Sequence, residues 1–320
     1  MRKDRHEKKK KSLGKKIAIG LGSFVGLLLI VGGIVFVIAY NDVANTMKNT
    51  HTAVERKDGL TNETKSAALI NEGKPFTVLL LGIDATEAND LTGRSDTIIL
   101  ATINPQERTT TLVSIARDTY ISGISTNKIN AAYAFGGAAG AMDAVEQLLN
   151  VPVNQFITFN MEAVERMVDA VGGVSVDNAF AFDFQDDRVT KESFHFEQGE
   201  IHLTGKQALA FSRMRYDDPR GDYGRQERQR QVIEAVMRKV ATVDGLTNYR
   251  DMLTVLGDNM KTSLTWDQMR GLITNYRSAA DTIKQDNLQG VGDMVNGSSV
   301  QVVSSDEINR VHELIAGQLK

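Results

Sequence analysis

The chain has 320 residues, a formal net charge of −3 and no cysteine. The lack of cysteine excludes disulfides, thiolate catalysis and cysteine metal sites, so stability must come from a buried apolar core. Charge is distributed unevenly, because residues 1–16 carry nine Lys or Arg and two acids, a net +7, which leaves −10 on the rest of the chain. Such an acidic body argues against a nucleic-acid partner.

Residues 17–40 contain no charged residue. As a helix they extend about 36 Å, enough to cross a hydrocarbon core of about 30 Å, and therefore predict one N-terminal transmembrane helix. A cleaved signal peptide is the alternative, but its apolar region is usually about 7 to 15 residues long and is followed by an A-x-A-like site, which is not evident here. Because basic residues stay in the cytoplasm, we expect a single-pass type II protein of the cell membrane. Residues 1–16 would be a cytoplasmic tail contacting anionic lipids, and the bulk of the chain would be extracytoplasmic.

Residues 41–74 are polar and predict a stalk outside the membrane, with a helix around 52–70. At Phe76 the sequence changes to FTVLLLGI, a continuous apolar run that ends at Asp84. A run of this kind is typical of a strand buried on both faces, so we expect the folded domain to start here.

Two further strands are expected at 97–103 and 109–116, separated by a turn at Asn104 and Pro105. Short connections favour antiparallel neighbours, and therefore a meander of three strands. In a meander the end of the first strand, the start of the second and the end of the third share one edge of the sheet. That edge would receive Asp84, Arg94, Asp96, Arg117 and Asp118.

Helices and strands alternate in the remainder of the chain. This pattern predicts an α/β or mixed α+β class, with a central mixed β-sheet flanked by helices. We expect helices at 130–150, 161–171, 204–211 and 225–240, strands at 155–159, 174–176 and 300–303, and a last helix capped by Ser304 and Glu307 with an inward stripe of Ile308, Val311, Ile315 and Leu319.

Arginines recur at the ends of the expected elements. Arg213 and Arg215 are two residues apart and share a face only if the chain is extended, so the preceding helix should end by about Ser212. Arg225, Arg228 and Gln229 follow helical spacing, with Asp222 as a candidate N-cap. Guanidinium groups suit a diphosphate, because they bind closely spaced phosphate oxygens through bidentate, charge-assisted hydrogen bonds.

Asp84 and Asp96 provide two carboxylates at the same expected edge, and could hold Mg²⁺ or Mn²⁺, which prefer oxygen ligands. The alternative is that Asp84 caps a turn, Asp96 pairs with Arg94 or Arg117, and all the arginines form solvated salt bridges. Considered singly, each residue fits that alternative. Considered together, they favour a site.

Five stretches make this interpretation specific: LLLGID, GRSDTIIL, TLVSIARDTY, KINAAYAFGG and LTGKQALAFSRMRYDDPRGDYGRQERQRQVI. In this order they resemble the LytR-CpsA-Psr family of cell-wall phosphotransferases, over roughly 76–240. Members of that family transfer glycopolymers, such as wall teichoic acid or capsule, from a polyprenyl diphosphate carrier to peptidoglycan. The family also encloses the lipid in an apolar tunnel, whereas here the apolar stripe Val164, Met167, Val168 and Val171 is interpreted as core.

The resemblance implies roles for individual residues. It makes 75–245 the catalytic domain and 246–320 the C-terminal completion of the same domain. Asp84 and Asp96 match metal-binding aspartates. The diphosphate would be bound by Arg94, Arg117, Arg213, Arg215, Arg225 and Gln229, with Asp96, Arg117, Arg213 and Arg215 taking part in catalysis. Lys128 and Asn130 belong to the KIN motif without an assigned role.

The resulting hypothesis is a metal-assisted phosphotransferase, with a polyprenyl diphosphate-linked glycopolymer and peptidoglycan as substrates. A polyprenyl-diphosphate pyrophosphatase is a second enzymatic interpretation, in which water replaces the sugar hydroxyl. A non-catalytic envelope regulator that binds polyprenyl lipid is an alternative from another class. The sequence assigns no general base.

Overall fold

The structure is a computed structural model that describes residues 41–42, 44–46, 48–54, 63–85, 90–124, 126–185, 192–240, 254–255 and 257–320. The chain divides into two units, residues 1–45 and 46–320, and all the strands that the structure describes lie in the second. The transmembrane helix predicted at 17–40 lies outside the described residues. In the described ranges, none of the helices combines the length and the apolar character that a bilayer crossing needs.

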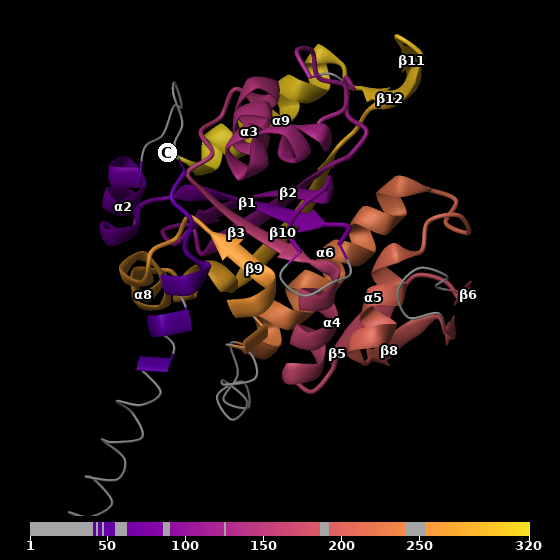
Figure 1. Cartoon of the computed structure of the whole chain (residues 1–320), viewed down its shortest axis with the longest axis horizontal. Coiled ribbons are helices and arrows are strands. Elements are labelled where there is room, and N and C mark those ends of the chain that lie inside the picture. The colour runs from indigo at the N-terminus through magenta and orange to yellow at the C-terminus, as the bar shows by residue number, and fades with distance from the viewer. Residues whose placement is uncertain are drawn as a thin grey trace, which may run out of the picture. The chain divides into compact units, whose positions relative to one another are not determined.

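A six-stranded mixed sheet forms the centre of the second unit, with the strand order β10-β3-β2-β1-β4-β9 (Figure 1). The pairs β1–β2, β2–β3 and β4–β9 are antiparallel, and the pairs β1–β4 and β3–β10 are parallel. This arrangement confirms the expected class and the three-stranded meander. The strands are β1 (Phe76–Ile83), β2 (Ser95–Asn104), β3 (Thr109–Ile115), β4 (Gln155–Asn160), β9 (Met260–Thr262) and β10 (Thr282–Leu288).

The apolar run of β1 is buried because both faces of the sheet are covered. Successive side chains of a strand point to opposite faces. Leu79 and Leu81 accordingly pack into one core cluster, and Phe76 and Val78 into another. Burying each of these side chains contributes roughly 1.5–3 kcal/mol.

Helices supply the covering layers (Figure 1). Helices α3 (Ala131–Leu149) and α9 (Ser305–Gln318) contribute to the cluster around Leu79 and Leu81, where Val311 and Ile315 of the expected stripe are fully buried. Helices α2 (Glu63–Asn71) and α8 (Trp266–Asn275) pack against the opposite face. A one-turn 3₁₀ helix, Arg277–Ala280, leads into β10.

A separate hydrophobic core cluster forms among the helices and two-stranded sheets in the middle of the chain. Val168 is fully buried in it, together with Phe182, Phe196 and Phe211, whose rings contact one another. The expected core stripe therefore does contribute to a core. The elements are α4 (Met161–Ala170), β5 (Val174–Asn178), β6 (Phe182–Gln185), β7 (Ser193–Phe196), β8 (Gly199–Leu203), α5 (Gly205–Arg213) and α6 (Asp222–Val240).

The expected stalk differs in part from the structure. Ile70 of α2 is fully buried against the sheet, and the Ser66 hydroxyl donates a hydrogen bond to the Asn154 carbonyl at 3.1 Å. Thr50 is also buried. The packed unit therefore includes residues before Phe76, because one short apolar turn in a polar segment is enough to dock a helix.

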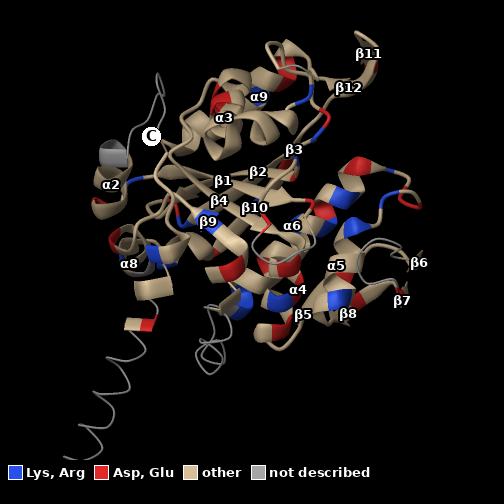
Figure 2. Ribbon diagram, viewed as in Figure 1, with Lys and Arg blue, Asp and Glu red and all other residues tan. Residues whose placement is uncertain are grey.

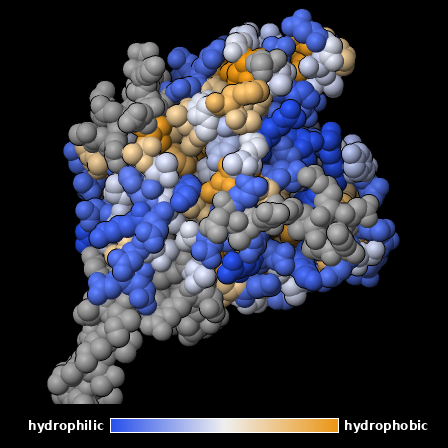
Figure 3. All heavy atoms as spheres, viewed as in Figure 1, coloured by the Kyte–Doolittle hydropathy of each residue, from blue (hydrophilic) through white to orange (hydrophobic). Residues whose placement is uncertain are grey.

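Apolar side chains also reach the surface. In the space-filling view the surface is mostly hydrophilic, with apolar atoms over α3 and near the hairpin of β11 (Val291–Val295) and β12 (Ser298–Val302) (Figure 3). Phe135 in α3 and Val291 and Met294 in β11 are exposed large apolar residues. The hairpin is held to the β3–α3 connection, since the Tyr120 amide donates to the Gln301 carbonyl and the Gln301 amide to the Asp118 carbonyl, both at 2.8 Å.

Candidate functional site

A polar pocket of about 440 Å³ lies at the edge of the sheet where β1 ends, β2 begins and β3 ends. The meander places these strand ends together, as expected from the short connections. The pocket contains all five side chains assigned to this edge from the sequence, with two more from the KIN motif: Asp84, Arg94, Asp96, Arg117, Asp118, Lys128 and Asn130.

The KIN motif holds the strand ends in place. The Asn130 amide donates to the Arg117 carbonyl at 3.2 Å, and the Ser95 amide donates to the Asn130 carbonyl at 3.4 Å. Asn130 is buried. The start of α3 is therefore tied to both β2 and β3. The KIN motif was visible in the sequence. Its backbone hydrogen bonds to the ends of two strands could not be predicted, because they depend on the tertiary fold.

Charges in this pocket are paired within it. The Arg117 guanidinium donates to Asp96 Oδ2 at 2.5 Å, and its Nε lies 3.7 Å from Asp118 Oδ2. Lys128 Nζ donates to Asp118 Oδ1 at 2.8 Å. Burial lowers the pKa of Arg117, but the carboxylates of Asp96 and Asp118 outweigh burial and raise it, so Arg117 stays charged.

The first turn of α6 adds a second group of charges. Arg225 is buried and its Nη2 lies 2.6 Å from Asp222 Oδ1, while Arg215 Nε lies 3.6 Å from the same oxygen. Asp222 is thus the first residue of α6 and a bridge between two arginines, rather than the N-cap expected. Figure 2 shows basic and acidic residues intermixed along α6.

The two groups of charges act on each other. Burial lowers the pKa of Arg225; the carboxylates of Asp222 and Asp96 oppose this shift, whereas the cations Arg117 and Arg215 add to it. Helix α6 lies close to the end of β3, since Arg230 of α6 donates to the Ser114 hydroxyl of β3 at 2.6 Å. Arginines far apart in the sequence therefore converge around shared carboxylates.

Arg225 has more donors than partners. Its Nε is buried, and among the described residues no acceptor forms a hydrogen bond with it. Nearly all buried polar groups in folded proteins are hydrogen-bonded, so this N–H is suited to an acceptor from outside the chain. An anion would also relieve the repulsion among Arg117, Arg215 and Arg225.

Arg213 and Gln229 line a second, narrow pocket instead of the first. Its cavity volume is about 30 Å³, and most of its wall is apolar, including Phe159, Val164 and Val232. Gly82 and Thr97 also line it, and these residues are near neighbours in the chain of Asp84 and Asp96. Among the described residues, none lines both pockets.

The local backbone explains why Arg213 and Arg215 separate. Helix α5 ends at Arg213, one residue later than expected, and Met214 is extended with φ −57° and ψ 133°. The chain has thus left the helix between the two arginines. Arg213 faces the narrow pocket, and Arg215 approaches Asp222.

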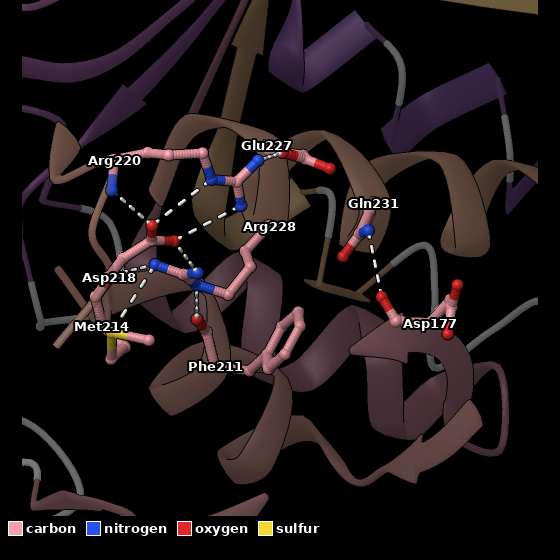
Figure 4. Close-up of polar contacts among 8 residues, drawn as sticks. All are labelled: Asp177, Phe211, Met214, Asp218, Arg220, Glu227, Arg228 and Gln231. Atoms are coloured by element: carbon pink, nitrogen blue, oxygen red, sulfur yellow. Dashed lines mark hydrogen bonds and ion pairs between the residues drawn. The ribbon is translucent and has the colours of Figure 1, made fainter. Parts of the chain in front are cut away.

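Arg228, which shares a helical stripe with Arg225, does not join the site. Its side chain is 5% exposed and forms a buried ion pair with Asp218 (Figure 4). The expectation that Arg228 belongs to the arginine cluster around the ligand is therefore wrong. Arginines three apart on a helix look equivalent in the sequence. Arg228, however, donates hydrogen bonds to backbone carbonyls at the end of α5 and so does not line the ligand site.

Asp84 and Asp96 both line the polar pocket, as the metal hypothesis requires. Within the described ranges there is no group of three or more His, Asp or Glu side chains arranged to hold a metal ion. Two carboxylates nevertheless fit Mg²⁺, which is commonly held by one or two carboxylates together with water and substrate phosphates. Asp96 Oδ2 already accepts from Arg117, so the other oxygen of Asp96 is the candidate donor.

The sequence matches a known protein family over most of its length. The model of a family described as LytR_cpsA_psr matches residues 37–316. The chain belongs to the LytR-CpsA-Psr family. The matched region includes both pockets and extends on either side of the motifs that first indicated the resemblance.

Individual LytR-CpsA-Psr proteins are similar over most of their length. The "Polyisoprenyl-teichoic acid--peptidoglycan teichoic acid transferase TagU" of Enterococcus faecalis is 46% identical over 313 residues, which cover 96% of this chain and 99% of that protein. The crystal structure of Bacillus subtilis TagU is 39% identical with a TM-score of 0.60, covering 77% of this chain and 97% of that one. A structure described as "TagT bound to LIIa-WTA" is 27% identical with a TM-score of 0.63, covering 84% and 96%.

Proposed function

We propose that this chain transfers a glycopolymer from a polyprenyl diphosphate carrier to peptidoglycan. The observation that carries the proposal is the convergence of Arg117, Arg215 and Arg225 on the carboxylates of Asp96 and Asp222. In addition, the buried Nε–H of Arg225 has no acceptor among the described residues. The relatives named as teichoic acid transferases support the substrate class. A glycopolymer of the teichoic acid class is therefore the proposed cargo.

In this reaction an acceptor sugar hydroxyl attacks the phosphorus that bears the glycopolymer. The new P–O bond forms as the phosphoanhydride bond breaks, the hydroxyl proton is lost, and polyprenyl phosphate leaves. Arg117, Arg215 and Arg225, with Arg213 from the wall of the neighbouring narrow pocket, bind the phosphate oxygens and neutralise the charge that develops on them, while Arg94 and Lys128 contribute positive charge at the pocket wall. Catalysis thus consists mainly of positioning and electrostatic stabilisation.

Asp84 and Asp96 would hold Mg²⁺ or Mn²⁺ in the polar pocket. When bound there, the ion supplies charge neutralisation to phosphate oxygens and to the leaving group.

We also place the catalytic unit outside the cytoplasm, anchored to the cell membrane by residues 17–40. The uncharged segment and the basic residues before it support this placement. Peptidoglycan lies on that side of the membrane. The location and the acceptor are therefore consistent with each other.

Arginine substitutions in the full-length chain test the proposed activity. In proteoliposomes supplied with lipid-linked glycopolymer and peptidoglycan fragments, Arg117→Ala and Arg215→Ala should each lower the transfer rate by roughly 100-fold, since each removes a charge from the diphosphate site. Arg238→Ala is the matched control, because Arg238 is exposed and pairs with Glu234 near the other end of α6. Undiminished transfer by both site variants would rule out the proposed diphosphate site.

A further inference from the structure

Asp218 and Arg228 form a buried ion pair next to the site but outside its pockets. Their side chains are 0% and 5% exposed, and Arg228 Nη1 donates to Asp218 Oδ2 at 2.7 Å (Figure 4). Neither residue is among those that line the two pockets of the site. A buried pair is costly to desolvate, so its benefit must come from the groups that it holds.

Arg228 fastens the end of α5. Its Nε donates to the Phe211 carbonyl at 3.1 Å, and its Nη2 donates to the Met214 carbonyl at 2.6 Å. These two carbonyls lie on either side of Arg213 in the chain. The guanidinium is also close to the rings of Phe182 and Phe211, with centroids at 5.6 and 5.9 Å. A single planar group thereby fixes the point where the chain leaves the helix.

Asp218 fastens the loop that connects α5 to α6. Its Oδ1 accepts from the Arg220 amide at 2.8 Å, and its Oδ2 accepts from Arg228. The first turn of α6 packs directly on this carboxylate, since a Cβ placed on Gly224 would lie 1.7 Å from Asp218 Oδ2. The loop, the end of α5 and the start of α6 therefore meet at one carboxylate.

We propose that Asp218 and Arg228 are positioning residues that hold Arg213, Arg215 and Arg225 in register for the diphosphate. The three arginines lie on the three segments that the pair joins. The inference rests on the proposed function, because it assumes that these arginines bind a diphosphate. Substitution of Asp218 or Arg228 should change ligand affinity only by displacing the arginines, because neither side chain touches the ligand.

Binding of farnesyl diphosphate to the full-length chain in detergent micelles gives the first measurement. Asp218→Asn keeps the volume of the side chain and removes its charge, and it should weaken binding roughly 10- to 100-fold, the range typical of residues that orient a binding group. The matched control is Asp267→Asn, because Asp267 is exposed and pairs with Arg270 in a helix on the surface. This control should bind like the wild type.

A double-mutant cycle separates positioning from a general loss of stability. In a chain that already carries Arg213→Ala and Arg215→Ala, Asp218→Asn should weaken binding by less than about threefold further, because two of the groups that it positions are gone. In an Arg117→Ala chain, whose missing arginine lies on another segment, Asp218→Asn should retain its full effect. Equal losses in all three backgrounds would overturn the proposal and leave a purely structural pair.

Arg228→Lys provides a second variant in case Asp218→Asn unfolds. Lysine keeps the charge opposite Asp218, but its ammonium does not reproduce the planar fork that reaches two carbonyls and a carboxylate at once. Arg228→Lys should give the same pattern in the cycle, and because the ion pair is kept it should lower the melting temperature less than Asp218→Asn does. Unchanged binding by Arg228→Lys would contradict the proposal. Failure of the wild-type chain to bind farnesyl diphosphate would instead contradict the proposed function.

Discussion

Arg225 illustrates a conflict between stability and function within one residue. It is buried, its pKa is lowered by burial and by the cations Arg117 and Arg215, and its Nε–H has no acceptor among the described residues. Without a ligand, such an arrangement favours the folded state less than an apolar side chain of the same length would. A bound anion reverses that balance, because it pairs the donor and screens the neighbouring cations.

Arg225→Met tests this conflict. The free energy of unfolding should stay within about 1 kcal/mol of the wild type, because the lost ion pair is offset by the lost desolvation and repulsion, and Asp222 keeps Arg215 nearby. Binding of farnesyl diphosphate should weaken at least about 10-fold. Denaturant unfolding and titration calorimetry on the same preparation measure both quantities. Unaltered affinity would show that Arg225 does not touch the ligand.

Residue types and spacing in the sequence predicted which side chains share the sheet edge, since all five line one pocket. They did not predict which carboxylate each arginine pairs with. Asp222 was expected to cap a helix and instead bridges Arg215 and Arg225, and Arg228 was grouped with the ligand-binding arginines but pairs with Asp218. Such choices depend on which carbonyls and carboxylates the tertiary fold brings within reach.

At the scale of elements, continuous apolar runs were enough to predict β1, β2 and β3, because strands buried on both faces need them. β10 was not expected, since its sequence TIKQDNL is mostly polar. Four of its seven positions are nevertheless half-buried or fully buried. It lies at the edge of the sheet and pairs in parallel with β3, far away in the chain. Hydrophobic periodicity contains no signal for a strand of that kind.

The junction of α5, its following loop and α6 depends on a close approach at Gly224. Gly224→Ala would drive a Cβ into the Asp218 carboxylate, and the shift needed should cost about 1–3 kcal/mol and weaken diphosphate binding. Gly317→Ala in α9 is the matched control, since nothing lies within 4 Å of its added Cβ, and it should be neutral or stabilise by up to about 1 kcal/mol. Thermal unfolding of both variants checks the difference. Equal stabilities would show that the junction can open at little cost.

At the scale of the whole molecule, the second unit continues before Phe76 and after 245. Helix α2 packs on the sheet, and β9 and β10 from the C-terminal part form its two edges. Composition alone marked residues 41–74 as polar, and a docked helix with a single fully buried isoleucine is easily overlooked in such a segment. The expected arrangement of cytoplasmic tail, membrane anchor and outer catalytic unit stays a prediction.

Topology can be measured directly because the chain has no cysteine of its own. In intact cells, a membrane-impermeant maleimide should label Ser305→Cys, an exposed position in α9, and should label Ser12→Cys only after permeabilisation. Both variants keep the charge pattern that determines orientation. Labelling of Ser12→Cys in intact cells, with protection of Ser305→Cys, would reverse the proposed orientation.

The central claim is that converging arginines bind a diphosphate and direct its transfer to a sugar hydroxyl. The most direct measurement is product analysis by mass spectrometry, with wild-type protein and lipid-linked glycopolymer incubated with and without peptidoglycan fragments. We predict that polyprenyl monophosphate and a phosphodiester-linked glycopolymer on the fragment appear together, and only when the fragment is present. Release of polyprenyl monophosphate at the same rate without the fragment, or no release in either case, would contradict the account.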